Sequence, residues 1–228
     1  MKDLKNFCKK YNHGIPAVIY FTIYMIWFRH LEKTVVKHYD IIHMKLDNFI
    51  PFCEIFIIPY LLWFGYVAVV LLYLFFCHKD DFIKSCAFLF TGMTIFLIIS
   101  TFWPNGHQLR PHIMPRDNIF TQLIGYLYTI DTSTNIWPSI HVYNSIGAHL
   151  GVVYNAKLRN NKVITVSSCI LCVSIILSTV LIKQHSVFDV LTAFIMAIVM
   201  YMAVYHNEYS LVMKMLQSRS KHSRPRVS

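Results

Sequence analysis

Six long apolar stretches run through this chain of 228 residues, and they constrain its fold more than any other feature. A helix needs about 20 mostly apolar residues to cross the hydrocarbon core of a bilayer. The stretches cover residues 15–28, 54–77, 82–103, 140–154, 163–182 and 187–205. The sequence therefore predicts an all-α, polytopic membrane protein, with six transmembrane helices in a bundle over residues 1–213. We expect residues 214–228 to form a basic, disordered cytoplasmic tail.

The composition excludes the main alternatives to a membrane protein. Hydrophobic residues make up 56% of the chain and charged residues 14%, and the mean hydropathy is +0.47. Soluble domains carry about 25% charged residues, and disordered chains are poor in hydrophobic ones. The formal net charge of +10 is typical of nucleic-acid binders, but this hydropathy argues against a nucleic-acid partner. The pair Cys169 and Cys172 lies within an apolar stretch, which favours buried packing over redox or metal chemistry.

The distribution of basic residues predicts the orientation in the membrane. With six spans, 14 of the 21 Lys and Arg residues fall on the side of the two termini. Because the cytoplasmic side of a membrane protein is the one richer in Lys and Arg, we expect both termini in the cytoplasm. The outer loops are then residues 31–53, 104–137 and 183–186.

Unusual polar residues collect on these outer loops. His185 and Asp189 are four positions apart, so on a helix they share one face, where the carboxylate can orient the imidazole. Ser139 is suited to cap a helix that carries His141 in its first turn, and a helix N-terminus favours an anion. Arg110 offers a guanidinium suited to phosphate. Each feature alone also fits a structural role: an ion pair, a simple cap or an exposed arginine.

Taken together, these residues resemble the signature of the type 2 phosphatidic acid phosphatase superfamily of integral-membrane lipid phosphatases. The family's second motif, Pro-Ser-x-His, is matched in full by residues 138–141. Its first motif is a lysine, six residues and Arg-Pro; Arg110 and Pro111 match, whereas Trp103 occupies the lysine position. The surrounding sequence is similar to a bacterial branch akin to inositol-phosphoceramide and sphingomyelin synthases.

The third motif of the family is matched with one departure. It consists of Ser-Arg, five residues, His, three residues and Asp. Ser178, His185 and Asp189 have this spacing, whereas Thr179 stands in the arginine position. The chain therefore lacks two cations that the family uses on phosphate. Lys183, His107, His112 or Arg116 could replace them, the substrate could be a less charged phosphodiester, or activity could be lost.

The resemblance implies a role for each matching residue. His185 would attack phosphorus and form a phosphohistidine, with Asp189 orienting it, and His141 would protonate the leaving oxygen. Arg110 and Ser139 would hold the phosphate oxygens. Two residues from His185, Lys183 is either a further phosphate ligand or a plain interfacial lysine. No metal or other cofactor is implied, and the partners are a membrane lipid substrate and the bilayer.

The predicted function is hydrolysis of a lipid phosphate or polyprenyl pyrophosphate at the outer face of the plasma (inner) membrane of a bacterium. The same histidine chemistry serves a lipid phosphotransferase that moves a phospho-headgroup to another lipid alcohol. An inactive relative or a small transporter is a further alternative, as is a metal site made of His141, His185 and Asp189. The oligomeric state is left open by the sequence.

Overall fold

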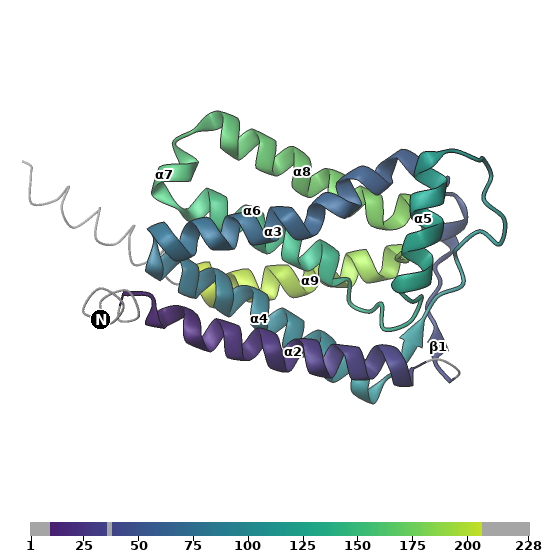
Figure 1. Cartoon of the computed structure of the whole chain (residues 1–228), viewed down its shortest axis with the longest axis horizontal. Helices are drawn as coiled ribbons and strands as arrows, with labels where there is room; N and C mark the ends of the chain where they lie inside the picture. Colours follow the sequence, from purple (N-terminus) through teal and green to yellow (C-terminus); the bar gives the residue numbers. More distant parts are fainter. Residues whose placement is uncertain (1–9, 36–37, 207–228) are drawn as a thin grey trace, which may run out of the picture.

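The computed structural model describes residues 10–35 and 38–206, and it is a bundle of helices (Figure 1). The α-helices are α2 (Ile15–Thr34), α3 (Ile57–Cys77), α4 (Lys79–Phe102), α5 (Ile119–Ile130), α6 (Ile140–Tyr154), α7 (Ala156–Arg159), α8 (Lys162–Leu181) and α9 (Val187–Tyr201). Short 3-10 helices η1 (Asn12–Gly14), η2 (Lys45–Asn48) and η3 (Glu54–Phe56) and a π-helical turn η4 (Met202–His206) adjoin them. Strands β1 (Asp40–Ile41) and β2 (Asn105–Gly106) pair in parallel. The predicted all-helical class is therefore confirmed.

Within the described residues, four helical segments are long and apolar enough to cross a membrane: Glu54–Cys77, Lys79–Phe102, Lys162–Leu181 and Val187–His206. Large apolar side chains on these segments, such as Phe64 and Ile195, are more than half exposed. Such exposure is expected where lipid surrounds a protein. Of the two other predicted spans, α2 has 20 residues and α6 has 15. The count of six spans stays a prediction. The predicted tail, residues 214–228, lies outside the described residues.

Helix α6 occupies the centre of the bundle and packs against α3, α4, α8 and α9. Tyr143 on α6 is fully buried; its ring stacks on Phe88 of α4 with centroids 4.6 Å apart, and its hydroxyl donates to the Phe88 carbonyl at 2.7 Å. Gly92 makes room for this ring, because a Cβ atom there would lie 2.1 Å from it. Close packing around α6 fixes the helix that carries His141.

Helix α5 lies within the second outer loop, for which the sequence predicted no helix. Asn118 caps it by accepting hydrogen bonds from the backbone N–H groups of Phe120 and Thr121, both at 3.0 Å. Its buried residues Ile124 and Leu127 pack with Tyr60 of α3. The loop is thereby folded back over the end of the bundle.

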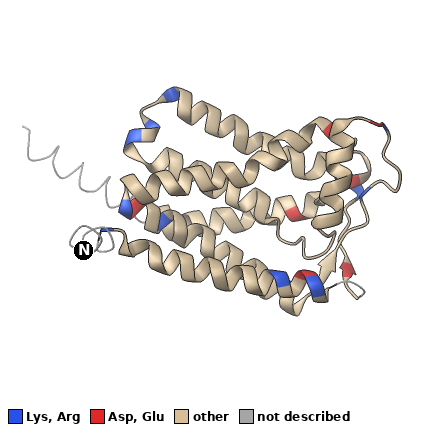
Figure 2. Ribbon diagram, in the orientation of Figure 1, with Lys and Arg blue, Asp and Glu red and all other residues tan. Residues whose placement is uncertain are grey.

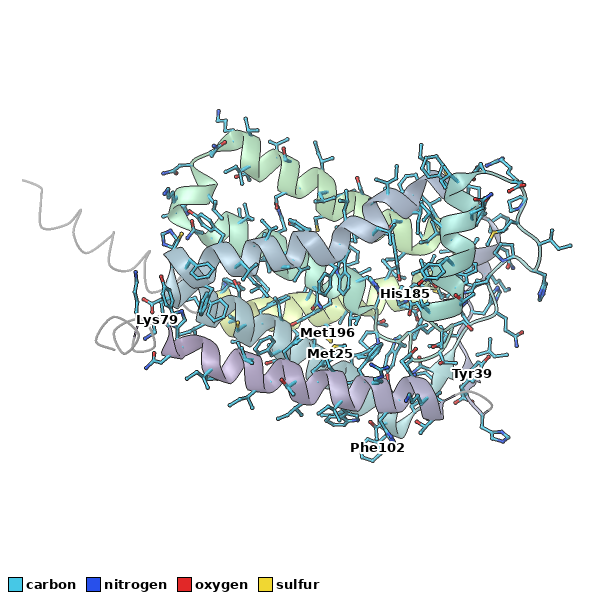
Figure 3. All side chains as sticks on the ribbon, in the orientation of Figure 1. Met25, Tyr39, Lys79, Phe102, His185 and Met196 are labelled. Atoms are coloured by element: carbon cyan, nitrogen blue, oxygen red, sulfur yellow. The ribbon has the colours of Figure 1, made fainter. Side chains whose placement is uncertain are left out.

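The two ends of the bundle differ in charge (Figure 2). Basic residues predominate at the end that holds α7 and the start of α4, where Asp80 and Asp81 are the acidic residues of the first turn of α4, whereas acidic and basic residues mix at the end that holds β1 and α5. Figure 3 shows Lys79 at the first end, Tyr39 at the second, and His185 in the half of the molecule nearer Tyr39. The histidine thus lies away from the basic end, although which end faces the cytoplasm stays a prediction.

Candidate active site

The turn between α8 and α9 presents His185 to the interior of the bundle. Helix α8 ends as the carbonyl of Thr179 accepts hydrogen bonds from the backbone N–H groups of Gln184 and His185, at 2.9 and 3.0 Å. Ser186 then caps α9: its hydroxyl oxygen accepts from the Phe188 N–H, and its own N–H donates to Asp189 at 2.8 Å. The backbone around His185 is therefore fixed on both sides.

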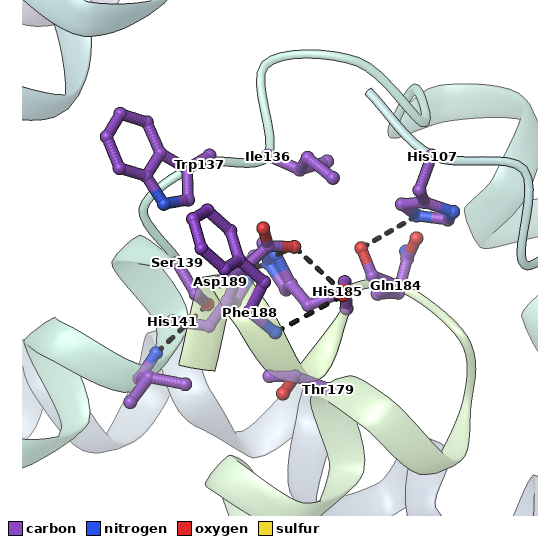
Figure 4. A network of polar contacts seen from close by, with 12 residues as sticks. His107, Ile136, Trp137, Ser139, His141, Thr179, Gln184, His185, Phe188 and Asp189 are labelled. Carbon is purple, nitrogen blue, oxygen red and sulfur yellow. Dashed lines mark hydrogen bonds and ion pairs between the residues drawn. The ribbon is translucent and has the colours of Figure 1, made fainter. Parts of the chain in front are cut away.

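His185 and Asp189 form the pair that their spacing predicted. His185 Nδ1 lies 3.3 Å from Asp189 Oδ2, with 6% of the histidine and none of the aspartate side chain exposed (Figure 4). Because the carboxylate accepts hydrogen bonds, it holds the proton of His185 on Nδ1. The lone pair of His185 is therefore on Nε2, the atom directed away from Asp189.

His141 faces this free nitrogen. Its Nδ1 lies 3.3 Å from His185 Nε2, and the two rings are roughly perpendicular. Since His185 Nε2 is the acceptor, His141 Nδ1 must carry the proton between them. Tyr60 and Trp63 of α3 pack against the His141 ring, with centroids 4.7 and 4.3 Å away. The structure thus places His185 between the Asp189 carboxylate on its Nδ1 side and the His141 ring on its Nε2 side.

Asp47 supports this site from the predicted first outer loop, a role that was not predicted from the sequence. Its Oδ2 accepts from the Ser186 hydroxyl at 2.6 Å and its Oδ1 from the Val187 N–H at 2.8 Å. It is also bonded to the Met44 N–H within η2. A buried carboxylate at the first turn of α9 satisfies unpaired amides and suits the positive end of the helix dipole.

Arg110 contacts Gln184, the residue that precedes His185. Its guanidinium donates to the carbonyls of Tyr128, Asp131 and Thr132 and to the Gln184 side chain, and it stacks over the Tyr128 ring at 4.3 Å. Its Nε has no hydrogen-bond partner among the described residues. The arginine therefore reaches the site through Gln184.

The other predicted phosphate ligands take different positions. Ser139 caps α6 as predicted, accepting from the Val142 N–H at 3.4 Å, and it is fully buried. The ammonium of Lys183 donates to the carbonyls of Asp47 and Ile50, at 3.0 and 2.6 Å. The structure therefore directs Lys183 towards the first outer loop and does not bring it to the histidine pair.

The two departures from the family motifs also have structural roles. Thr179 is buried, its hydroxyl donates to the Ile176 carbonyl, and its own carbonyl holds the turn before His185. Trp103 donates its indole N–H to Asp40 and packs edge-on against Trp137 at 5.0 Å. Neither side chain supplies a cation to the histidine pair.

His107 does not replace a missing cation at neutral pH. Burial, together with the nearby charge of Arg110, lowers the pKa of His107 to about 3. Its Nδ1 accepts from the Leu109 N–H at 3.1 Å, so its Nε2 donates to the Gln184 carbonyl at 2.9 Å. The neutral ring is a brace for the residue beside His185. Arg116, another candidate, is paired with Glu54 at 2.5 Å.

The three residues of the hypothetical metal site lie in a row. Asp189 and His141 contact opposite nitrogens of His185, so their ligand atoms do not converge on one point. No cluster of three His, Cys, Asp or Glu side chains suited to a metal ion occurs within residues 10–35 and 38–206.

Two cavities meet at His141. One is a polar pocket of about 30 Å³, bordered by His141, His185 and Gln184, with room for about two water molecules. The other is an apolar cavity of about 570 Å³ between α2, α3, α4 and α6, within the size range of ligand sites. The apolar cavity touches His141 but not His185, and Met25 in Figure 3 lies on its α2 side. A hydrocarbon chain and a polar head could therefore meet at the histidine pair.

Comparison with known proteins gives one match. Residues 107–212 match the sequence model of the PAP2 superfamily, the superfamily indicated by the motifs. The matched region includes Arg110, His141, His185 and Asp189. Neither the curated proteins nor the solved structures include a match to this chain.

Proposed function

We propose that this chain is an integral-membrane enzyme that hydrolyses a lipid phosphoester through a phosphohistidine. Its residues 107–212 match the model of the PAP2 superfamily, whose members are phosphatases or related phosphotransferases. The observation that carries the proposal is the row Asp189, His185, His141, with both contacts at 3.3 Å. It supplies a nucleophile, its orienting carboxylate and a proton donor in the order that the reaction needs.

The reaction has two steps. His185 Nε2 donates its lone pair to phosphorus and the bond between phosphorus and the lipid oxygen breaks. His141, protonated on both ring nitrogens for this step, gives its Nδ1 proton to that oxygen and becomes neutral. In the second step His141 takes a proton from water, the water oxygen attacks phosphorus, and the phosphorus–nitrogen bond breaks. Asp189 stabilises the positive charge on the phosphorylated imidazole. Substrate must separate the two histidines, because phosphorus has to reach the nitrogen that now faces His141.

The apolar cavity supports a lipid substrate. It is lined mostly by apolar side chains of α2, α3 and α4, and His141 is one of its lining residues. A lipid oxygen at the end of a chain in this cavity would lie beside the proposed proton donor. We propose that the site opens to the outer face of the plasma membrane, in agreement with the distribution of basic residues.

The test uses the full-length protein in detergent. Wild type is offered radiolabelled phosphatidic acid, a polyprenyl pyrophosphate and a phosphodiester lipid, with a chelator present. We expect phosphate or phospho-headgroup release and an acid-labile, base-stable phosphoprotein in an alkali-quenched reaction. His185→Ala removes both, whereas His38→Ala, a change of an exposed histidine outside the motifs, retains both. Turnover by His185→Ala, or loss of turnover on chelation, would overturn the mechanism.

A second candidate is transfer of the phospho-group to another lipid alcohol. It is favoured by Asn144, which lines the apolar cavity and whose buried Oδ1 has no partner among the described residues. An unpaired acceptor in an apolar cavity suits the hydroxyl of a lipid. Asn144→Leu should then reduce formation of a new phospholipid, measured by mass spectrometry, more than it reduces hydrolysis. Equal loss of both products would count against transfer.

A further inference from the structure

The polar pocket beside the histidine pair is rich in hydrogen-bond acceptors. Glu32 of α2 borders it, together with Asp131, Thr132, Thr134 and Asn135 from the segment that follows α5. The Glu32 carboxylate accepts from the Thr132 hydroxyl at 2.6 Å and from the Asn135 amide at 3.0 Å. None of the residues that border the pocket is a lysine or an arginine.

Asn135 leaves one acceptor of this pocket unpaired. Its side-chain Oδ1 is buried and has no hydrogen-bond partner among the described residues, and the whole residue is 5% exposed. The Asn135 NH₂ group donates to Glu32. Exchanging the amide O and N positions would therefore place the oxygen against the Glu32 carboxylate, which is unfavourable. A buried, unpaired carbonyl oxygen costs free energy, which a ligand N–H or O–H donor would recover.

Charge narrows the choice of ligand. Among the described residues, the Glu32 carboxylate accepts hydrogen bonds from two neutral donors, the Thr132 hydroxyl and the Asn135 amide. Burial raises the pKa of Asp131, and its Oδ2 already accepts from Tyr60 and Gln184. Arg110 and Lys183, the two basic residues predicted to bind phosphate, donate to carbonyl groups, and neither borders the pocket. A dianionic phosphomonoester would therefore find an anionic neighbour at Glu32, whereas a substrate that brings its own cation would be neutralised there.

The two cavities also indicate which bond breaks. The apolar cavity adjoins the proton donor His141, so the oxygen on the hydrocarbon side is the one placed to receive a proton. The acceptor-rich pocket adjoins both His141 and His185, so a headgroup held there stays with the phosphorus.

We propose that the substrate is a phosphodiester lipid whose headgroup ends in a primary ammonium, held by the Glu32 carboxylate and the Asn135 Oδ1. This rests on the proposed phosphohistidine reaction. His185 Nε2 forms a bond to phosphorus, the bond to the glycerol oxygen breaks, and that oxygen takes the His141 proton and leaves as a diacylglycerol. The headgroup phosphate remains on His185 as a phosphodiester analogue until water or a lipid hydroxyl removes it. The small volume of the pocket requires the two histidines to part as the headgroup enters.

Three lipids of equal chain length separate charge from hydrogen bonding. Phosphatidylethanolamine has a cation with N–H donors, phosphatidylcholine has a cation without them, and phosphatidylglycerol has O–H donors without a cation. Binding to the full-length His185→Ala protein in detergent is measured by displacement of a fluorescent lipid, so the result does not depend on turnover. We expect phosphatidylethanolamine to bind about ten- to hundred-fold more tightly than either of the others, as for a charge-assisted hydrogen bond.

Variants in the same background connect this preference to Glu32. Glu32→Gln keeps the size of the side chain and removes its charge, and we expect it to abolish most of the preference for phosphatidylethanolamine. Asp117→Asn is the matched control, because Asp117 is an exposed outer-loop carboxylate that also accepts from an amide, that of Gln122. If Glu32→Gln does not fold, the comparison of the three lipids still tests whether the site prefers an ammonium headgroup with N–H donors.

The outcomes separate this inference from the proposed function. Equal binding of the three lipids, or an unchanged preference in Glu32→Gln, overturns the headgroup assignment even if wild type forms a phosphohistidine. A preference for phosphatidylethanolamine that depends on Glu32 supports the headgroup site. If wild type also forms no phosphoprotein with any of the lipids, the proposed reaction is overturned and the headgroup site is retained. Release of phosphatidic acid and ethanolamine in place of diacylglycerol would refute the assigned bond cleavage.

Discussion

Replacement of Asp189 by asparagine isolates the electrostatic contribution of this carboxylate. Its Oδ2 accepts from the Ser186 N–H at 2.8 Å and contacts His185, whereas its Oδ1 has no partner in the described part of the chain. In Asp189→Asn the amide oxygen should therefore take the place of Oδ2, because Ser186 requires an acceptor there. The proton of His185 stays on Nδ1, and only the negative charge is lost.

The expected magnitude follows from the distance of 3.3 Å between His185 Nδ1 and Asp189 Oδ2. At an effective dielectric constant of about 20, two unit charges at this distance attract by about 5 kcal/mol. A transition state with half to all of the positive charge on the imidazole therefore loses about 2.5–5 kcal/mol, which lowers kcat by about 10²- to 10⁴-fold. The new amide N–H₂ is buried without an acceptor, which costs about 1–3 kcal/mol of folding stability.

The assay measures the first step directly. Wild type, Asp189→Asn and the surface control Asp117→Asn are mixed with labelled lipid and quenched in alkali, and the rate of phosphohistidine formation is recorded. Thermal unfolding in detergent shows whether the variant is folded at the assay temperature. A folded Asp189→Asn protein that is phosphorylated within tenfold of the wild-type rate would refute the electrostatic role of Asp189.

Three further predictions test the surroundings of the site. Because the pKa of His107 is about 3 in the folded protein and about 6.5 in an unfolded chain, the unfolded state binds more protons between these values, and stability falls as the pH falls below about 6.5. The loss is about 2 kcal/mol at pH 5, so thermal unfolding at pH 5 and pH 8 should differ less in His107→Gln than in wild type or the exposed-site control His112→Gln. Gly92→Ala should destabilise the protein by about 1–3 kcal/mol, because its Cβ would lie 2.1 Å from Tyr143, whereas Gly65→Ala, with nothing within 4 Å, should be neutral or slightly stabilising in the same denaturation assay. Ala68→Trp places a large side chain in the apolar cavity. If it excludes two methylenes of the lipid chain, KM for long-chain lipids should rise about tenfold, whereas KM for a short-chain analogue should not change. An equal effect on both substrates would contradict a chain-binding role.

The helices were predictable because their signal is local. A run of apolar residues long enough to cross a bilayer is visible without any knowledge of packing, and the stretch at residues 140–154 coincides with α6. The Ser139 cap and the contact of His185 with Asp189 were predictable for the same reason, since both join residues within one helical turn. Helix α5 was missed because it is short and lies in a loop, where its amphipathic face packs on α3.

Contacts between segments that are distant in the sequence could not be predicted from it. Asp47 is 139 positions from Ser186, and Glu32 is 103 positions from Asn135, so no spacing rule connects them. The direction of the Lys183 side chain was equally undetermined: it is two residues from His185, yet its ammonium donates to carbonyls of the first outer loop.

The sequence by itself determined that this is a helical, membrane-type chain with motif residues of the PAP2 superfamily, because hydropathy and short spacings are properties of the chain alone. Only the tertiary structure decided which atoms meet. The packing of α3, α6 and α9 aligns Asp189, His185 and His141 in one row, and the fold of the outer segments places Glu32 and Asn135 beside them. Side-chain direction depends on neighbours brought together by folding, and for that reason the acceptor-rich pocket has no signature in the sequence.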